Sequence, residues 1–167
     1  MYFCKIDISA PWGYDDCQGG VSMRVYLDNC CFNRPFDDQS NLLNHLETQA
    51  KLMVQELVRS HQIELVWSFV LDFENNDNPY AERRERIAEW KRLACVDCEL
   101  CNEIAERAEA LMRFGFRQKD ASHIACAVYT HTDYFVTTDK KILNKQCSEI
   151  VLINPVDFLR RHIENGN

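Results

Sequence analysis

The chain has 167 residues, of which 46% are hydrophobic, and it carries a formal net charge of −7. This length and apolar content predict one domain with a buried core, and they exclude a disordered chain. They also exclude an overall basic surface for nucleic acid, so any contact with a polyanion must use a local cationic patch or metal ions.

Neither membrane insertion nor export is expected, because no apolar run reaches the length of a transmembrane helix and the N-terminus lacks the apolar core of a signal peptide. We therefore expect a cytoplasmic protein whose nine cysteines are reduced. Cys95, Cys98 and Cys101 form a C-x-x-C-x-x-C pattern. An iron–sulfur cluster would need a fourth ligand, and zinc would need a second ligand pair. With Val96 and Leu100 interleaved, we interpret these thiols as small hydrophobic residues.

The first elements follow an expected irregular arm over 1–22, so the compact domain is predicted over 23–167. The run RVYL at 24–27 predicts a strand, with Asp28 at its carboxyl end. Ser40 is predicted to cap a helix that runs to about residue 59. Its inward face is expected to hold Leu42, Leu43, Leu46, Ala50, Met53, Val54, Leu57 and Val58.

The middle of the chain continues the alternation of strands and helices. A strand is predicted over 63–68, and a helix begins over 69–74 before a polar run breaks it. A charged helix over 82–93 and a short strand over 95–99 follow. The next helix, over 102–114 and closed by Gly115, is expected to bury Leu100, Ile104, Ala105, Ala108, Leu111 and Met112.

The stretch over 119–143 organises the rest of the chain. Asp120 is predicted to open a helix with a small apolar face, and YFVT at 134–137 predicts a buried strand. Asp139 follows that strand at its carboxyl end, where open α/β sheets bind ligands. A last strand over 150–153 leads into a helix that starts at Asn154-Pro155. This alternation predicts an α/β fold with a parallel sheet.

Three acids are expected to converge if the first and fourth strands are neighbours: Asp28, Asp120 and Asp139. Clustered carboxylates repel one another, and a hard divalent cation such as Mg²⁺ relieves that repulsion. Such a site suits phosphodiester hydrolysis. The alternative is that Asp120 and Asp139 are only helix N-caps. Neither glycine-rich phosphate-loop motif occurs, which argues against a nucleotide cofactor.

Four segments carry a resemblance to a known family: YLDNCCFNRPF, WSFVLDFEN, KDASHIACA and YFVTTDKKIL. In this order they resemble the PIN-domain nucleases, and the toxin-type (VapC-like) members in particular, over roughly residues 23–160. The resemblance implies a three-layer α/β/α fold with a mostly parallel central sheet. It also implies a ribonuclease that uses Mg²⁺ or Mn²⁺ to hydrolyse single-stranded RNA.

The resemblance assigns the catalytic and metal-binding acids to Asp28, Glu74, Asp120 and Asp139. Asp72 competes with Glu74 for the second position, and Asp77 is a further alternative. Asn29 and Thr137 match supporting positions. His123 could reach the site, but imidazole is a poor ligand for Mg²⁺, so a structural role is favoured. Many PIN proteins are the toxin of a toxin–antitoxin pair and form dimers, which implies an antitoxin partner and a homodimer.

Cationic residues flank the predicted acids and offer a local route to RNA. Ordinary complementation of helix ends explains them equally well. The group comprises Arg34, Arg113, Arg117, Lys119, Lys140, Lys141 and Lys145. Two other functions stay open: a non-catalytic PIN-like binding module, and a metal-dependent phosphohydrolase that acts on a small phosphate ester.

Overall fold

The computed structural model describes residues 23–33 and 40–165, so the expected arm over 1–22 lies outside the described residues, as do 34–39 and 166–167. One parallel sheet forms the centre, with strand order β3-β2-β1-β4-β5. The strands are β1 (Arg24–Leu27), β2 (Glu64–Ser68), β3 (Ala94–Cys98), β4 (Tyr134–Val136) and β5 (Val151–Ile153). All five predicted strands are confirmed to within one residue at each end.

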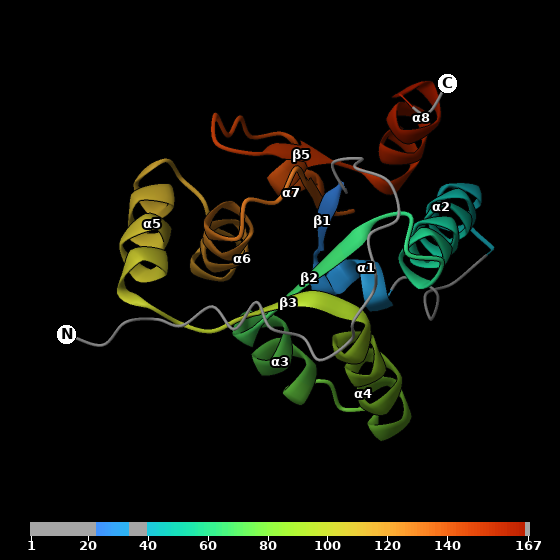
Figure 1. The fold of residues 1–167 in the computed structure, drawn as a ribbon, viewed down its shortest axis with the longest axis horizontal. Coiled ribbons are helices and arrows are strands. Elements are labelled where there is room, and N and C mark those ends of the chain that lie inside the picture. The colour runs from blue at the N-terminus through green and yellow to red at the C-terminus, as the bar shows by residue number, and fades with distance from the viewer. Residues whose placement is uncertain (1–22, 34–39, 166–167) are drawn as a thin grey trace, which may run out of the picture.

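Helices cover both faces of this sheet and complete a three-layer α/β/α fold (Figure 1). One face carries α5 (Asn102–Arg113) and α6 (Gln118–Tyr129), and the other carries α2 (Leu42–Arg59) and α8 (Pro155–Asn165). The shorter helices are α1 (Asn29–Asn33), α3 (Phe69–Asn76), α4 (Ala81–Ala88) and α7 (Lys140–Leu143). No helix in the described part of the chain is long and apolar enough to cross a membrane.

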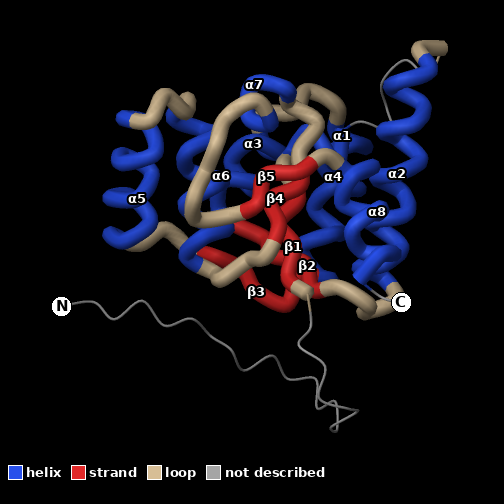
Figure 2. Tube along the Cα trace, turned by 90° about the horizontal axis from the view of Figure 1, so that it is seen from above, coloured by secondary structure: helices blue, strands red, loops and turns tan. Residues whose placement is uncertain are grey.

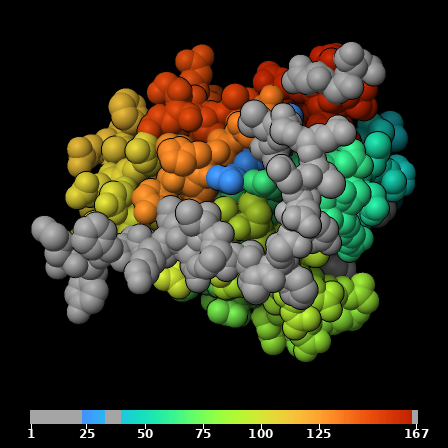
Figure 3. All heavy atoms as spheres, viewed as in Figure 1, coloured from blue at the N-terminus to red at the C-terminus, as the bar shows by residue number. Residues whose placement is uncertain are grey.

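The central strands are buried on both faces, as expected for a parallel sheet covered by helices. Val25, Tyr26 and Leu27 are at most 1% exposed. Helix α6 is also buried on most sides because it lies between the sheet and α5, and three alanines permit this close approach. At the amino end of the sheet, β1 shows as a small blue patch between orange and green atoms (Figure 3).

The strand order places a topological switch point between β1 and β4. The chain runs outward from β1 through β2 to β3, and it then returns to the other side of β1 as β4. Leu27 pairs with Val136, so Asp28 and Thr137 leave the sheet side by side. Such a switch point is where open α/β sheets form ligand sites. Figure 2 shows α3 and α7 together at this end of the sheet.

The predicted burial of α2 is wrong at four positions, three of which lie in its first two turns. Its cap is Asn41 rather than Ser40, because the Asn41 side chain accepts the backbone N–H groups of Leu43 and Asn44. Four residues that were expected to face inward are exposed: Leu42, Leu43, Leu46 and Met53. An 18-residue helix spans about 27 Å, whereas the five-residue strand β2 spans about 17 Å. The start of α2 therefore extends beyond the sheet (Figure 2).

Three smaller differences affect other helices. The predicted helix over 82–93 divides into α4 and a 3₁₀ helix over Glu89–Leu93. Leu100 and Met112 are exposed rather than buried, because Leu100 precedes α5 and Met112 lies on its outer side. Helix α6 begins at Gln118, so Asp120 lies within the first turn and is not the N-cap. Gly115 ends α5 at a φ of +90°, which favours glycine.

Candidate metal centre

Thr137 is the centre of a hydrogen-bond network that includes Asp28 and Asp139. Asp28 follows β1 directly and is only 7% exposed. Its Oδ2 accepts a hydrogen bond of 2.6 Å from the Thr137 hydroxyl, and the same hydroxyl oxygen accepts the Asp139 backbone N–H at 3.0 Å. Thr137 therefore joins the acid after β1 to the loop that carries Asp139. Asp139 in turn caps α7 by accepting the Lys141 N–H at 2.7 Å.

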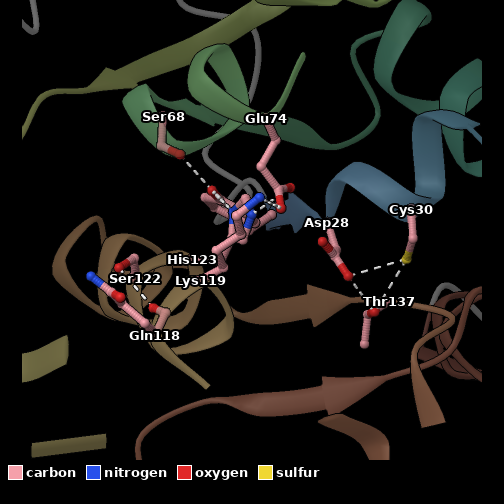
Figure 4. A network of polar contacts seen from close by, with 10 residues as sticks. Asp28, Cys30, Ser68, Glu74, Gln118, Lys119, Ser122, His123 and Thr137 are labelled. Carbon is pink, nitrogen blue, oxygen red and sulfur yellow. Dashed lines mark hydrogen bonds and ion pairs between the residues drawn. The ribbon is translucent and has the colours of Figure 1, made fainter. Parts of the chain in front are cut away.

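Glu74 lies on α3 and points toward Asp28. Its Oε2 lies 3.0 Å from Nε2 of His123, and its Oε1 lies 3.6 Å from the Lys119 ammonium (Figure 4). Burial alone would raise the pKa of Glu74, but its hydrogen bond with His123 and the electrostatic effects of His123 and Lys119 outweigh burial. The pKa of Glu74 is therefore lowered, and the carboxylate is held ionised although its side chain is only 17% exposed.

Asp120 completes the acidic group from the first turn of α6. Burial raises the pKa of Asp120, and the charges of Asp28 and Asp139 raise it further. The charges of Arg117 and His123 act in the opposite sense but do not cancel the shift. The charges of Asp28 and Asp139 therefore act on Asp120 in the same direction as its burial.

The arrangement could hold a metal ion. Asp28, Glu74 and His123 each offer one ligand atom, and these atoms lie within 4.8 Å of one another. Asp28 and Glu74 supply carboxylate oxygens, which suit hard divalent cations. Burial and the repulsion from Asp28 and Asp139 both raise the pKa of Asp120, and a bound cation would relieve the repulsion.

The two competitors of Glu74 have other partners or positions. Asp72 accepts a hydrogen bond from Trp67 Nε1 at 2.9 Å and forms an ion pair with Lys91 at 2.6 Å. Asp77 is the C-cap of α3. Of the three acids, Glu74 is therefore the one that the structure brings against Asp28 and His123.

Of the remaining predicted residues, five lie at the starts of α1, α6 and α7. Asn29 is half-buried at the first position of α1. Arg117 and Lys119 are exposed at the start of α6, and Lys140 and Lys141 are exposed at the start of α7. Arg113 turns toward Glu109 of its own helix, and Lys145 bonds to the Gly115 carbonyl. Arg34 lies outside the described residues.

Sequence reasoning missed several neighbours of the acids. The Cys30 thiol donates a hydrogen bond to Asp28 at 3.1 Å, and its sulfur accepts the Thr138 N–H at 3.3 Å. Cys30 lies two residues after Asp28, and this closeness in sequence is the signal that could have identified it as a neighbour of Asp28. Behind His123, Tyr26 and Ser68 form a buried hydrogen-bonded chain. No local pattern identifies that chain, because its members come from three separate elements.

Comparison with known proteins supports the fold but not a family assignment. No family model matches the chain, and no curated protein matches it. Among solved structures, FitAcB from Neisseria gonorrhoeae is similar, with a TM-score of 0.54 and 12% identity, over 79% of this chain and 98% of that one. VapBC2 from Rickettsia felis, bound to a DNA fragment from their promoter, has a TM-score of 0.48 and 14% identity, also over 79% of this chain and 98% of that one. The likeness to FitAcB supports the predicted three-layer α/β/α, PIN-like fold.

Proposed function

We propose that the chain is a divalent-metal-dependent endoribonuclease that hydrolyses phosphodiester bonds of single-stranded RNA. The observation that supports the proposal is that ligand atoms of Asp28 and Glu74 lie within 4.8 Å of one another at the switch point of the sheet, and that the charges of Asp28 and Asp139 act on Asp120. The PIN resemblance of the same four positions agrees with this arrangement.

The donor set fits Mg²⁺ or Mn²⁺, because it consists mainly of carboxylate oxygens. Asp28, Asp120 and Asp139 would hold the cation, and Glu74 would bind it directly or orient the attacking water. When bound, the ion supplies activation of a water and stabilisation of the leaving oxygen. Thr137 fixes one oxygen of Asp28, and Lys119 partly balances the charge of Glu74. By the family resemblance, the products would carry a 5′-phosphate and a 3′-hydroxyl.

The RNA backbone would approach along the cationic rim of this centre. Arg117, Lys119, Lys140 and Lys141 are exposed on the two helices that begin beside Asp120 and Asp139. A hollow of about 460 Å³ lies beside the start of α7, and it is lined in part by Cys30, Asp139 and Lys140. Phosphate contacts from these cations would give a net-acidic protein its affinity for RNA.

A protein partner is a further part of the proposal. Leu42, Leu43, Leu46 and Met53 leave one side of α2 apolar and exposed, and such patches commonly mark protein interfaces. Together with the PIN resemblance, this supports a toxin that pairs with an antitoxin, or a homodimer. Light scattering of wild type and of a Leu43→Lys, Leu46→Lys double variant tests the homodimer. The dimer is contradicted if wild type is monomeric.

Cleavage of a labelled single-stranded RNA tests the enzymatic proposal. We expect cleavage that requires Mg²⁺ or Mn²⁺ and is abolished by EDTA. Asp28→Asn and Asp139→Asn should each reduce it at least 100-fold, a loss in the range found when one electrostatic contributor to catalysis is removed. Cleavage that persists unchanged in both variants would show that the assigned site is wrong.

A matched pair of acids on α3 gives the control. Glu74→Gln should lose activity, whereas Asp72→Asn should retain it, because Asp72 is engaged with Trp67 and Lys91. Thermal melting of both variants separates a loss of chemistry from a loss of folding. Hydrolysis of p-nitrophenyl phosphate without RNA cleavage would favour a phosphohydrolase. Binding of RNA without cleavage would favour a non-catalytic module.

A further inference from the structure

His123 lies at the centre of a buried chain of hydrogen bonds that leads from the candidate metal centre into the core. Its Nε2 is 3.0 Å from Glu74, and its Nδ1 is 2.7 Å from the Tyr26 hydroxyl. The Tyr26 hydroxyl is in turn 2.5 Å from the Ser68 hydroxyl. Tyr26 and Ser68 are fully buried, and His123 is 2% exposed. Both ring nitrogens of His123 are therefore engaged.

The chemistry of these partners decides where the hydrogens lie. An ionised carboxylate only accepts hydrogen bonds, so Nε2 of His123 must carry a proton. In a neutral ring, Nδ1 then accepts the Tyr26 O–H, and Tyr26 accepts from Ser68. In a charged ring, Nδ1–H donates to Tyr26, and Tyr26 donates to Ser68. Either direction leaves no free lone pair on Nε2.

The surroundings fix this chain in place. Tyr26 stacks on Phe135 with ring centroids 5.3 Å apart, and its ring meets His123 edge-on at 5.7 Å. Burial raises the pKa of Tyr26 well above its ordinary value, so its hydroxyl keeps its proton. The imidazole is therefore held by β1 on one side and presented to α3 on the other.

We propose that His123 is a positioning residue that orients Glu74 through Nε2–H, and that it does not itself bind the cation. This inference rests on the proposed metal-dependent function. It assigns the Tyr26 and Ser68 hydroxyls a role in the site, although neither touches it. Of the three residues that could hold a metal ion, Asp28 and Glu74 are then the proposed ligands, and His123 orients Glu74.

The first test is the protonation pattern of His123 in the whole chain. Long-range ¹H–¹⁵N spectra of the labelled protein report which ring nitrogen carries hydrogen, and the His123→Gln variant identifies the signals. We expect a proton on Nε2 both without and with saturating Mg²⁺. A neutral ring with its only proton on Nδ1 would overturn the proposal, because Nε2 could then bind a cation.

The second test compares two substitutions by their affinity for Mg²⁺, measured by calorimetry. His123→Leu removes the donor to Glu74, and we expect it to weaken Mg²⁺ binding about 10- to 100-fold, as for other groups that orient a ligand. His123→Gln keeps an N–H donor and should recover part of that loss. If His123 only fills space, leucine should match or exceed glutamine, and this result would overturn the proposal.

Tyr26→Phe tests the far end of the chain. It removes the hydroxyl but keeps the ring on Phe135, so we expect weaker Mg²⁺ binding than in wild type. Tyr134→Phe is the matched control, because Tyr134 pairs with Val25 at the amino end of the sheet. Failure of the wild type to bind Mg²⁺ would overturn the proposed function as well. Tight binding that is unchanged in His123→Leu would overturn the positioning role alone.

Discussion

At the scale of single residues, the candidate site contains two carboxyl groups whose pKa values are shifted in opposite directions. Glu74 lies against His123 and Lys119, which lower its pKa despite burial. Asp120 lies partly buried near Asp28 and Asp139, and its pKa is raised. The surroundings of Glu74 thus favour its charged form, whereas those of Asp120 disfavour it.

Asp120 is expected to destabilise the metal-free protein. A raised pKa means that the folded chain holds the Asp120 proton more tightly than the unfolded chain does. Stability from this group is therefore present at low pH and is lost as the pH rises through the raised pKa. We expect Asp120→Asn to raise the melting temperature in EDTA at neutral pH, with no gain below the range where aspartate titrates.

Salt and a second variant check this prediction. Because Asp120 is partly exposed, the gain should shrink at high ionic strength. Glu109→Gln on α5, whose carboxylate is 71% exposed and lies 3.9 Å from Arg113, should change the melting temperature little. A destabilised Asp120→Asn protein in EDTA would show that the three aspartates do not repel one another.

At the scale of elements, the first and last turns of α2 differ in how deeply their apolar residues are buried. Its first turns extend beyond the sheet and expose Leu42, Leu43 and Leu46, whereas Val54 and Val58 in its second half are at most 2% exposed. The helical period is continuous along all of them. Periodicity reports which side of a helix is apolar, but it does not report how far the neighbouring layer extends.

Two truncations in α2 measure this difference. Val54→Ala should destabilise the fold by about 2 kcal/mol, because it leaves a gap in the core. Leu46→Ala should change stability by less than about 0.5 kcal/mol, as is usual for exposed positions. Urea denaturation of the two variants at micromolar concentration provides the measurement. Equal losses would mean that Leu46 is buried, either in the fold or in an oligomer.

At the scale of the whole molecule, the strand order creates the site. The chain leaves β1 in one direction and returns beside it as β4, so Asp28 and the Thr137–Asp139 loop meet at one end of the sheet. Helices α3 and α6 then bring Glu74 and Asp120 to the same end. A cation bound there would connect segments that are more than one hundred residues apart in the chain.

Metal binding should therefore stabilise the entire fold. Mg²⁺ at 100 times its dissociation constant adds about 2.7 kcal/mol, which corresponds to a rise in melting temperature of about 5–10 °C for a domain of this size. Asp28→Asn should abolish most of that rise, and Asp72→Asn should keep it. Scanning calorimetry with and without Mg²⁺ measures the effect, and an equal rise in both variants would place the cation elsewhere.

Local sequence patterns predict all five strands and most of the helices in their observed order. The runs RVYL and YFVT form the expected strands, Gly115 follows the end of α5, and the Asn-Pro pair at 154–155 begins α8 as predicted. The placement of Asp28 at the end of a central strand follows from the same local pattern.

Long-range packing gives different partners to acids that are close in sequence, and it gives His123 its partners. Asp72 and Glu74 are two residues apart on one helix. This spacing is a rotation of about 200° around the helix axis, so they point to nearly opposite sides. One meets Trp67 and Lys91, and the other meets His123. The side of α3 that faces the candidate metal centre depends on how α3 packs against α6. The local sequence of α3 does not specify that packing. Local periodicity specifies an element, whereas the partners of a side chain depend on which distant elements pack beside it.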